Sequence, residues 1–318
     1  MVTIPSGHCY RGTIVAVSSR TASPGLVIVD VCSGDVRPVE QGECAWSSVP
    51  ALSSDGEYVA YQGASGRVQV IPSQGGRCLT IGRAPSGYVR PIWSPSGQFL
   101  AWDDDGMTEV MSATGEQVAR IEGTGPTWLG NGEAILTVRG REVIKCDPTG
   151  SSCDVIDSWL RPGDQVWAVH GATHGSMYAS VASVEGQLVL TVHDWFTGES
   201  STVPVGENVW PWSVRWSPDC TMIAAESGSQ TASGNQVTIT FFEVDRSGPG
   251  LRPIDEVSLV SDPRYAGLSW NNTSTAVTVA ARTGGTGAYA VYVLEPLGAV
   301  HRLTGRGDHV LPDWGPSR

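Results

Sequence analysis

Short apolar runs alternate with polar turns along most of the chain, and this alternation is its dominant pattern. Glycine recurs in the turns, as in Ser73-Gln-Gly-Gly76, Pro148-Thr-Gly150 and Phe196-Thr-Gly198. Glycine adopts the positive φ that tight hairpin turns require. No stretch carries the 3.6-residue apolar period of an amphipathic helix over three turns. The pattern therefore predicts an all-β protein made of short strands joined by hairpins.

A longer phrase repeats within this alternation. A large apolar residue, here called the anchor, ends one run; a polar turn follows, and a second apolar run begins. The phrase is clearest in residues 51–61, 91–102 and 214–225, and weaker copies fill the gaps. The anchors lie 35 to 54 residues apart, close to the roughly 40–45 residues of a four-stranded propeller blade. They are Leu52, Trp93, Trp128, Trp167, Trp216, Trp270 and Trp314.

The first six anchors begin complete units, whereas Trp314 has no strands after it. The N-terminal runs Thr13–Val17, Leu26–Asp30 and Asp35–Val39 look like the three strands that this unit lacks. Pairing of the C-terminal strand with them would close the ring and protect its sheet edges. We therefore expect a single seven-bladed β-propeller domain over residues 1–318. A six-bladed ring is the alternative, if the unit of Trp128 or Trp167 does not form a full blade.

The anchor turns carry a family resemblance. Trp93-Ser-Pro-Ser-Gly97 and Trp216-Ser-Pro-Asp-Cys220, each followed by an apolar strand, resemble the WD40-like Pro-Asp repeat of the TolB propeller family. Similar repeats occur in the propeller domains of prolyl oligopeptidases. The resemblance covers nearly the whole chain but maps no family site residue onto it. It implies protein–protein binding at the cell envelope. The repeats leave no room for the extra N-terminal domain of TolB or for a peptidase catalytic domain.

The charge balance excludes two classes of partner. The formal net charge is −12, with 20 basic and 32 acidic residues, and Lys145 is the one lysine. A nucleic-acid surface needs a basic patch, so nucleic acid is not expected, and an anionic membrane surface is disfavoured for the same reason. The chain lacks a run of about 20 apolar residues, and residues 1–7 lack the features of a signal peptide. Either the protein is cytoplasmic, or a leader or anchor has been removed; a periplasmic or extracellular location is slightly favoured.

Seven cysteines bear on the compartment. Cys146 and Cys153 fall at the base of a predicted hairpin, where opposed Cβ atoms can come close enough for a disulfide. Cys9, Cys32 and Cys44 flank the closing blade and could also pair. The alternative is a set of reduced, half-buried thiols that behave as small apolar side chains. The odd total leaves at least one free thiol in a monomer.

Aromatic residues fall into two groups. We expect the anchor tryptophans to fill the wedge between neighbouring blades. A second group of aromatic, arginine and histidine residues lies just before the anchors, in segments that form loops at one mouth of a propeller's central channel. Trp, Tyr and Arg dominate binding hot spots. The candidate binding residues are Trp46, Tyr88, Arg90, Trp210, Trp212, Arg264, Tyr265 and His309.

These residues favour a non-catalytic propeller of TolB-like type that binds a protein segment or peptide at the channel mouth. We expect a monomer that carries no metal and no cofactor and does not insert into the membrane. The competing interpretation of the second group is structural: the side chains fold back over the blade tops as lids. Carbohydrate binding is a further alternative, since exposed aromatic rings also suit a sugar face.

An enzyme is the other alternative, a lyase or hydrolase with a polar site in the channel around Asp308, His309 and His170. No Gly-x-Ser-x-Gly elbow or phosphate-binding loop supports it. His170 and His174 are four residues apart in what reads as a loose polar turn, which favours solvent-exposed histidines over a metal site. Asp103-Asp-Asp-Gly106 reads as a hairpin turn rather than a calcium loop.

Overall fold

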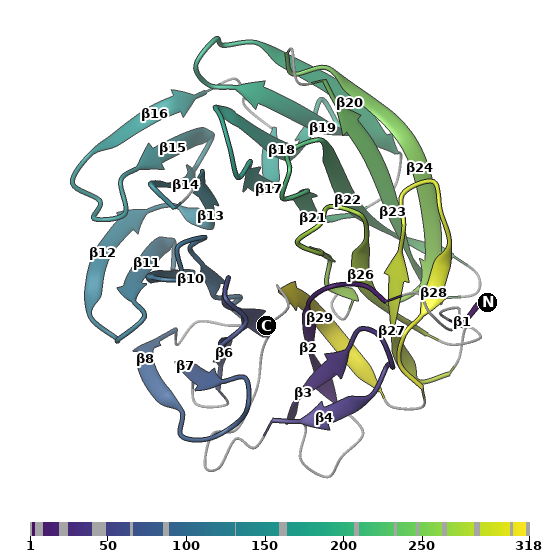
Figure 1. Cartoon of the computed structure of the whole chain (residues 1–318). Helices are drawn as coiled ribbons and strands as arrows, with labels where there is room; N and C mark the ends of the chain where they lie inside the picture. The colour runs from purple at the N-terminus through teal and green to yellow at the C-terminus, as the bar shows by residue number, and fades with distance from the viewer. Residues whose placement is uncertain are drawn as a thin grey trace.

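The computed structural model shows seven sheets arranged as blades around a central axis, each built on four antiparallel strands (Figure 1). The structure describes residues 2–3, 9–18, 25–39, 49–63, 66–84, 89–130, 132–158, 164–206, 210–231, 234–245, 248–262, 266–282, 287–305 and 308–315. Within these ranges no helix is long and apolar enough to span a membrane. The predicted all-β, seven-bladed propeller is confirmed, and the six-bladed alternative is wrong.

The first three blades follow the chain in order, innermost strand first. Blade 1 contains β5 (Ala51–Leu52), β6 (Tyr58–Gln62), β7 (Arg67–Pro72) and β8 (Leu79–Arg83). Blade 2 contains β9 (Ile92–Trp93), β10 (Phe99–Asp104), β11 (Met107–Ser112) and β12 (Gln117–Glu122). Blade 3 contains β13 (Thr124–Leu129), β14 (Ala134–Arg139), β15 (Glu142–Cys146) and β16 (Cys153–Asp157).

The next three blades have the same order, and two of them have longer strands. Blade 4 contains β17 (Gln165–Gly171), β18 (Met177–Val184), β19 (Gln187–Asp194) and β20 (Ser200–Gly206). Blade 5 contains β21 (Trp210–Trp216), β22 (Met222–Thr231), β23 (Gly234–Val244) and β24 (Leu251–Val260). Blade 6 contains β25 (Ser269–Trp270), β26 (Val277–Arg282), β27 (Tyr289–Leu294) and β28 (Val300–Arg302).

Blade 7 closes the ring with strands from both ends of the chain. Its innermost strand is β29 (His309–Gly315), which pairs antiparallel with β2 (Thr13–Ser18); β3 (Gly25–Asp30) and β4 (Val36–Pro38) complete it. This is the predicted closure. One strand was not predicted: β1 (Val2–Thr3) pairs in parallel with β28 and widens blade 6 to five strands. In Figure 1 the C-terminus lies at the axis, and the N-terminus lies at the periphery.

The serine after an anchor organises the turn that the repeat motif encodes. The Ser94 hydroxyl accepts a hydrogen bond from the Phe99 amide at 3.0 Å, and the Ser217 hydroxyl accepts one from Met222 at 2.9 Å. The last turn residue has a positive φ, 69° at Gly97 and 57° at Cys220. Glycine adopts this conformation without strain, and other residues do so at a cost. The motif is therefore a property of the turn geometry.

Anchor tryptophans join four of the blades to the blade before them. The indole Nε1 of Trp93 donates to the carbonyl of Ala51, that of Trp128 to Ile92, and that of Trp270 to Arg215. These N···O distances are 3.1, 3.3 and 3.0 Å. In each case the acceptor is the residue just before the preceding blade's anchor. Each bond therefore ties an anchor indole to the backbone of the preceding blade.

A second set of bonds runs in the opposite sense. The side chain just before an anchor accepts a hydrogen bond from the backbone N–H of the next blade's anchor. Asp313 accepts from Leu52 at 2.8 Å, and Ser269 accepts from Trp314 at 3.1 Å. His170 accepts through Nδ1 from Trp216 at 3.4 Å. Polar side chains at this position therefore fasten blade to blade around the axis.

The anchor prediction was wrong in blade 4. There the residue that pairs like the other anchors is Gly171, opposite Tyr178, just as Trp216 pairs with Ile223. A Cβ built on Gly171 would lie 2.6 Å from the Trp128 carbonyl oxygen, so the neighbouring blade leaves no space for a side chain. Trp167 stands four residues earlier, at a β-bulge between Val166 and Ala168.

The apolar core lies between blades. The described core residues fall into seven clusters, and each joins residues of neighbouring blades. One cluster combines Trp270 of blade 6 with Ile239 and Phe241 of blade 5, with the Phe241 ring set edge-on against the Trp270 indole. This placement is the predicted wedge-filling role of the anchors.

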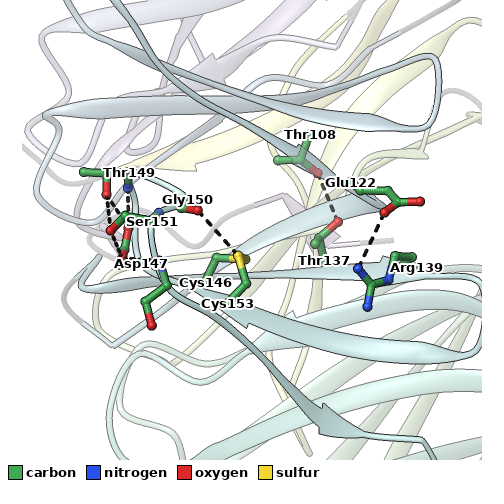
Figure 2. The surroundings of a disulfide bond; sticks show 11 residues. Thr108, Glu122, Thr137, Arg139, Cys146, Asp147, Thr149, Gly150, Ser151 and Cys153 are labelled. Atoms are coloured by element: carbon green, nitrogen blue, oxygen red, sulfur yellow. Dashed lines mark hydrogen bonds and ion pairs between the residues drawn. A yellow bond between two sulfur atoms is a disulfide. The ribbon is translucent and has the colours of Figure 1, made fainter.

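Cysteine pairing follows one of the alternatives left open by the sequence. Cys146 and Cys153 form a disulfide across the base of the β15–β16 hairpin (Figure 2). In the turn between them, the Asp147 carboxylate accepts hydrogen bonds from Thr149 and Ser151. Cys9 and Cys32 form a second disulfide within blade 7, and Cys78 is also disulfide-bonded. Cys220 is free and buried.

Removing one indole hydrogen bond will lower the stability of the ring. Trp270→Phe keeps an aromatic ring at a side chain that is 6% exposed but deprives the Arg215 carbonyl of its donor. We expect a loss of about 1–3 kcal/mol in the free energy of unfolding. Denaturant titration measures it, with Phe196→Leu as the control because Phe196 is 80% exposed. An unchanged midpoint in Trp270→Phe would refute the role of the indole bond.

Cysteine labelling will separate the free thiol from the bonded ones. Alkylation in denaturant without reductant, followed by peptide mapping, should label Cys220 and leave Cys9, Cys32, Cys78, Cys146 and Cys153 unmodified. Without denaturant Cys220 should stay unlabelled, because it is buried. Labelling of Cys146 or Cys153 before reduction would contradict the pairing.

Candidate functional site

The innermost strands begin at one end of the ring, here called the mouth, and run towards their anchors. The described residues include two predicted binding residues in full, Arg90 and His309. Trp210 and Trp212 lie in β21 at the mouth end of blade 5, although nothing is described of their side chains. The remaining four, Trp46, Tyr88, Arg264 and Tyr265, lie outside the described residues.

The strand register of β17 also places the backbone of Trp167 at the mouth. The bulge in β17 falls between Val166 and Ala168, and the bulge in β21 falls between Pro211 and Ser213. Trp167 and Trp212 therefore occupy the same place in adjacent blades, each four residues before the structural anchor. Bulges redirect side chains and are frequent beside functional sites. Sequence reasoning missed this equivalence because it took Trp167 for an anchor.

Blade 5 extends past the mouth. Its β22 and β23 have 10 and 11 residues, against six in β10 and β11 of blade 2. The β22 strand pairs Gly228 with Trp210 at the start of β21 and then continues to Thr231. The end of β22 and the start of β23 thus stand beyond the start of the innermost strand and form a raised edge beside Trp210 and Trp212.

Titratable side chains from four blades interact electrostatically on and beside the innermost strands. We call Arg90, His170, Arg215, Glu226 and Asp313 the axial cluster. Arg90 precedes β9, and its guanidinium contacts the Asp313 carboxylate of blade 7 at 3.4 Å, past blade 1. Ser213 of blade 5 donates to Glu226 Oε2 at 3.1 Å. Arg90, Arg215 and His170 keep part of their surface accessible, as side chains that line an axis do.

Electrostatics couples the members of the axial cluster. Burial, then the charge of Arg90, lowers the pKa of Arg215 to about 9, with Asp313 and Glu226 acting in the opposite direction. Burial raises the pKa of Glu226 to about 7, against the Ser213 hydroxyl and the two arginines. Burial and the two arginines hold the pKa of His170 well below its ordinary value. The imidazole of His170 is therefore neutral at pH 7, and burial favours the protonated form of Glu226 over its carboxylate.

The cluster had a sequence signal that was not used. Polar residues stand just before the structural anchor in five blades: Thr127, His170, Arg215, Ser269 and Asp313. A strand that is buried on both faces carries apolar residues at successive positions, so a polar residue there departs from the pattern. Sequence reasoning looked five or six residues before the anchors and passed over this position.

His309 and Asp308 do not join the axial cluster through any described contact. The Asp308 carboxylate accepts a hydrogen bond from the Tyr289 amide of blade 6 at 2.9 Å. His309 is buried, and burial lowers its pKa, although the Asp308 charge raises it. The structure therefore shows Asp308 in a contact with blade 6.

The structure also contradicts what we expected of His170. It lies in β17 with its ring against blade 5, and is not the solvent-exposed turn histidine that we expected. His174 is exposed in the turn, as expected. Asp105 and Gly106 have φ values of 50° and 79° and form the two-residue hairpin turn predicted for residues 103–106. Among the described residues no group of three His, Cys, Asp or Glu side chains could hold a metal ion.

Blades 3 and 4 share a hydrogen-bond chain that resembles a catalytic triad. Ser180 Oγ lies 3.1 Å from His193 Nε2, and His193 Nδ1 lies 3.0 Å from Asp157 Oδ2. Tyr178 donates to the same carboxylate at 2.5 Å and stacks on the imidazole. Ser180 has no exposed surface, so a substrate cannot reach its hydroxyl. These hydrogen bonds therefore fasten blade 3 to blade 4.

Comparison with known proteins identifies the fold. No family model and no curated protein matches the chain. Solved structures with the same fold include the β-propeller domain of Cps50 (Swd1) from Myceliophteria thermophila, at 15% identity, a TM-score of 0.61, and 82% and 87% of the two chains. A candidate 6-phosphogluconolactonase from Bacteroides uniformis is 13% identical, with a TM-score of 0.62. The match covers 95% of this chain and 99% of that chain. TolB from Acinetobacter baumannii is 13% identical, with a TM-score of 0.52, and the match covers 96% of this chain and 83% of that chain. At these identities the likeness shows the propeller fold alone.

The raised pKa of Glu226 makes stability depend on pH. The folded state holds the Glu226 proton more tightly than the unfolded state, so stability falls as pH rises from about 4.5 to about 7. Glu226→Gln removes this loss. We expect the variant to be more stable than wild type at pH 8, by up to about 3 kcal/mol, with a much smaller gain at pH 5. Urea titrations across this range measure the difference, and a constant difference would contradict the assignment.

Proposed function

We propose that this propeller is a non-catalytic binding protein of TolB-like type that holds a protein segment or peptide over its mouth. The binding residues would be the predicted set at the mouth, together with Trp167. The observation that carries the proposal is the shared register of Trp167 and Trp212 at matching bulges of adjacent blades. Two tryptophans at the same mouth-side position suit a ligand that lies across blades 4 and 5.

The shape of blade 5 supports an extended ligand. The β22–β23 hairpin extends beyond the start of β21, so the aromatic segment Trp210–Trp212 has a raised edge beside it. The hairpin is rich in hydrogen-bonding side chains, including Ser229, Gln230 and Gln236. A peptide backbone needs such partners along its length, and exposed aromatic side chains supply most of the binding energy.

Disulfides support an extracytoplasmic location for this function. Cys9–Cys32 and Cys146–Cys153 are bonded, and such bonds persist in oxidising compartments. A periplasmic or extracellular binding propeller agrees with the cell-envelope role that the TolB resemblance implies. Membership of the Pro-Asp repeat family is part of the same proposal.

A second candidate is an enzyme with its polar site at the axis. One observation favours it: Glu226 has a pKa of about 7 beside an arginine, and shifted carboxyl groups of this kind cluster at active sites. Glu226, rather than Asp308 or His309, would then be the acid–base group. Loss of a turnover activity in Glu226→Gln, with binding retained, would favour this candidate.

Capture of a partner tests the binding proposal. The protein serves as bait in extracts of its host, beside a Trp167→Ala, Trp210→Ala, Trp212→Ala variant. We expect a partner retained by wild type and reduced at least tenfold in the variant. Phe196→Ala is the matched control, because Phe196 is an exposed aromatic residue in the turn between β19 and β20, at the end opposite the mouth. It should capture the partner as wild type does.

Thermal unfolding of each protein separates loss of binding from loss of the fold. Equal capture by wild type and a folded triple variant would refute the mouth as the binding surface. A signal on a glycan array with no captured protein would favour the carbohydrate alternative instead.

A further inference from the structure

We infer that the axial cluster is an anion site that receives a carboxylate group of the bound segment through Arg90 and Arg215. The choice of a peptide carboxylate rests on the proposed function, whereas the anion site itself rests on the geometry of the cluster. Arg90 comes from the segment before blade 2, and Arg215 comes from β21 of blade 5. The two guanidinium groups therefore approach the axis from different sides of the ring.

Arg215 departs from the pattern of its position. Thr127, His170, Ser269 and Asp313 stand just before an anchor and accept a hydrogen bond from the next blade's anchor N–H. Arginine has five N–H donors and no acceptor, so Arg215 cannot do this for Trp270. The residue is thus unsuited to the structural role that its equivalents perform, and its charge is available for another role.

The donors of Arg215 are largely unused within the described residues. Its one described hydrogen bond runs from Nη1 to the carbonyl of Val214, the preceding residue, at 2.8 Å. No described carboxylate forms an ion pair with it. Arg215 is only partly accessible, and partial burial disfavours a charge unless an opposite charge compensates it. A bound anion would provide that compensation.

The two carboxylates of the cluster do not neutralise both arginines. Asp313 accepts from the Leu52 amide through Oδ2 and contacts Arg90 through Oδ1. Glu226 accepts from Ser213 through Oε2, while Oε1 is buried with no hydrogen-bond partner among the described residues. The orphaned Oε1 is itself a sign of a missing ligand group, because a protonated Glu226 can donate to a carboxylate.

A carboxylate suits this site better than a polyanion. Arginine binds carboxylates through two parallel N–H···O bonds, and two arginines can hold one carboxylate from two sides. The protein as a whole has a net charge of −12, which repels a ligand with many negative charges. A segment with one acidic side chain or a terminal carboxylate satisfies both conditions.

Small anions test the site without the natural ligand. Calorimetric titration of the full chain with succinate should show binding, while succinamide, its neutral equivalent, should not bind. Arg215→Met and Arg90→Met should each weaken succinate binding by about tenfold or more. Arg215→Lys keeps the charge but loses the paired donors, so it should fall between wild type and Arg215→Met. Arg252→Met is the control, since Arg252 is an exposed arginine of β24 that bonds Glu243.

Inorganic phosphate in the same titrations separates the two anion chemistries. Phosphate binding that depends on both arginines, with no succinate binding, would overturn the carboxylate assignment. Succinate binding that is absent, or equal in wild type and the Arg→Met variants, would overturn the site. Melting curves identify any variant that does not fold; Arg90→Met and Arg215→Lys then carry the test. Because no partner protein is present, the result is independent of the capture experiment.

Discussion

The structure depends on how the inner edges of the seven innermost strands are satisfied. Each of these strands has a sheet neighbour on one side only, and unpaired backbone groups away from water are costly. The chain meets this constraint with hydrogen bonds between neighbouring blades. A polar side chain just before one blade's anchor accepts a hydrogen bond from the anchor N–H of the next blade, on the edge that has no paired strand. Bonds from the anchor indoles to the backbone of the preceding blade add to this fastening. The bonds that close the ring therefore also bring polar residues to its axis.

This constraint explains why the axis is charged although the core between the blades is apolar. In four blades the residue before the anchor accepts such a bond, and two of these acceptors, Asp313 and His170, have titratable side chains. Arg90 and Arg215 are added to this framework and are not required by it. The fold places polar side chains at the axis for structural reasons, and the two arginines add positive charge to them.

Much of the fold could be predicted from the sequence because its signals are local. A serine that bonds the turn, a residue with positive φ and two apolar strands fit within about a dozen residues, as around Trp216. Closure by the two chain ends followed from counting such units. The failure at Trp167 has a local cause as well: Gly171 fills the anchor position without a side chain, so no large residue marks it.

Much less of the site could be predicted. Arg90 and Asp313 are 223 residues apart in sequence, and Arg90 reaches past the whole of blade 1 to make the contact. No spacing rule describes such a pair, because it depends on the ring's curvature and on side-chain reach. The shifted pKa of Glu226 likewise results from burial among groups of the folded chain.

Closure by both ends also dictates an order of events as the protein folds. In blade 7 the indole of Trp314 donates to the carbonyl of Arg11, 303 residues away in sequence. Blades 1 to 6 consist mainly of hairpins whose partners are close in sequence, so they can form early, whereas contacts of such long separation form late. Until β29 pairs with β2, blade 6 and blade 1 each lack a neighbour, and their apolar faces stay open to proteases and to other chains. We therefore expect resistance to degradation to appear only when β29 pairs with β2.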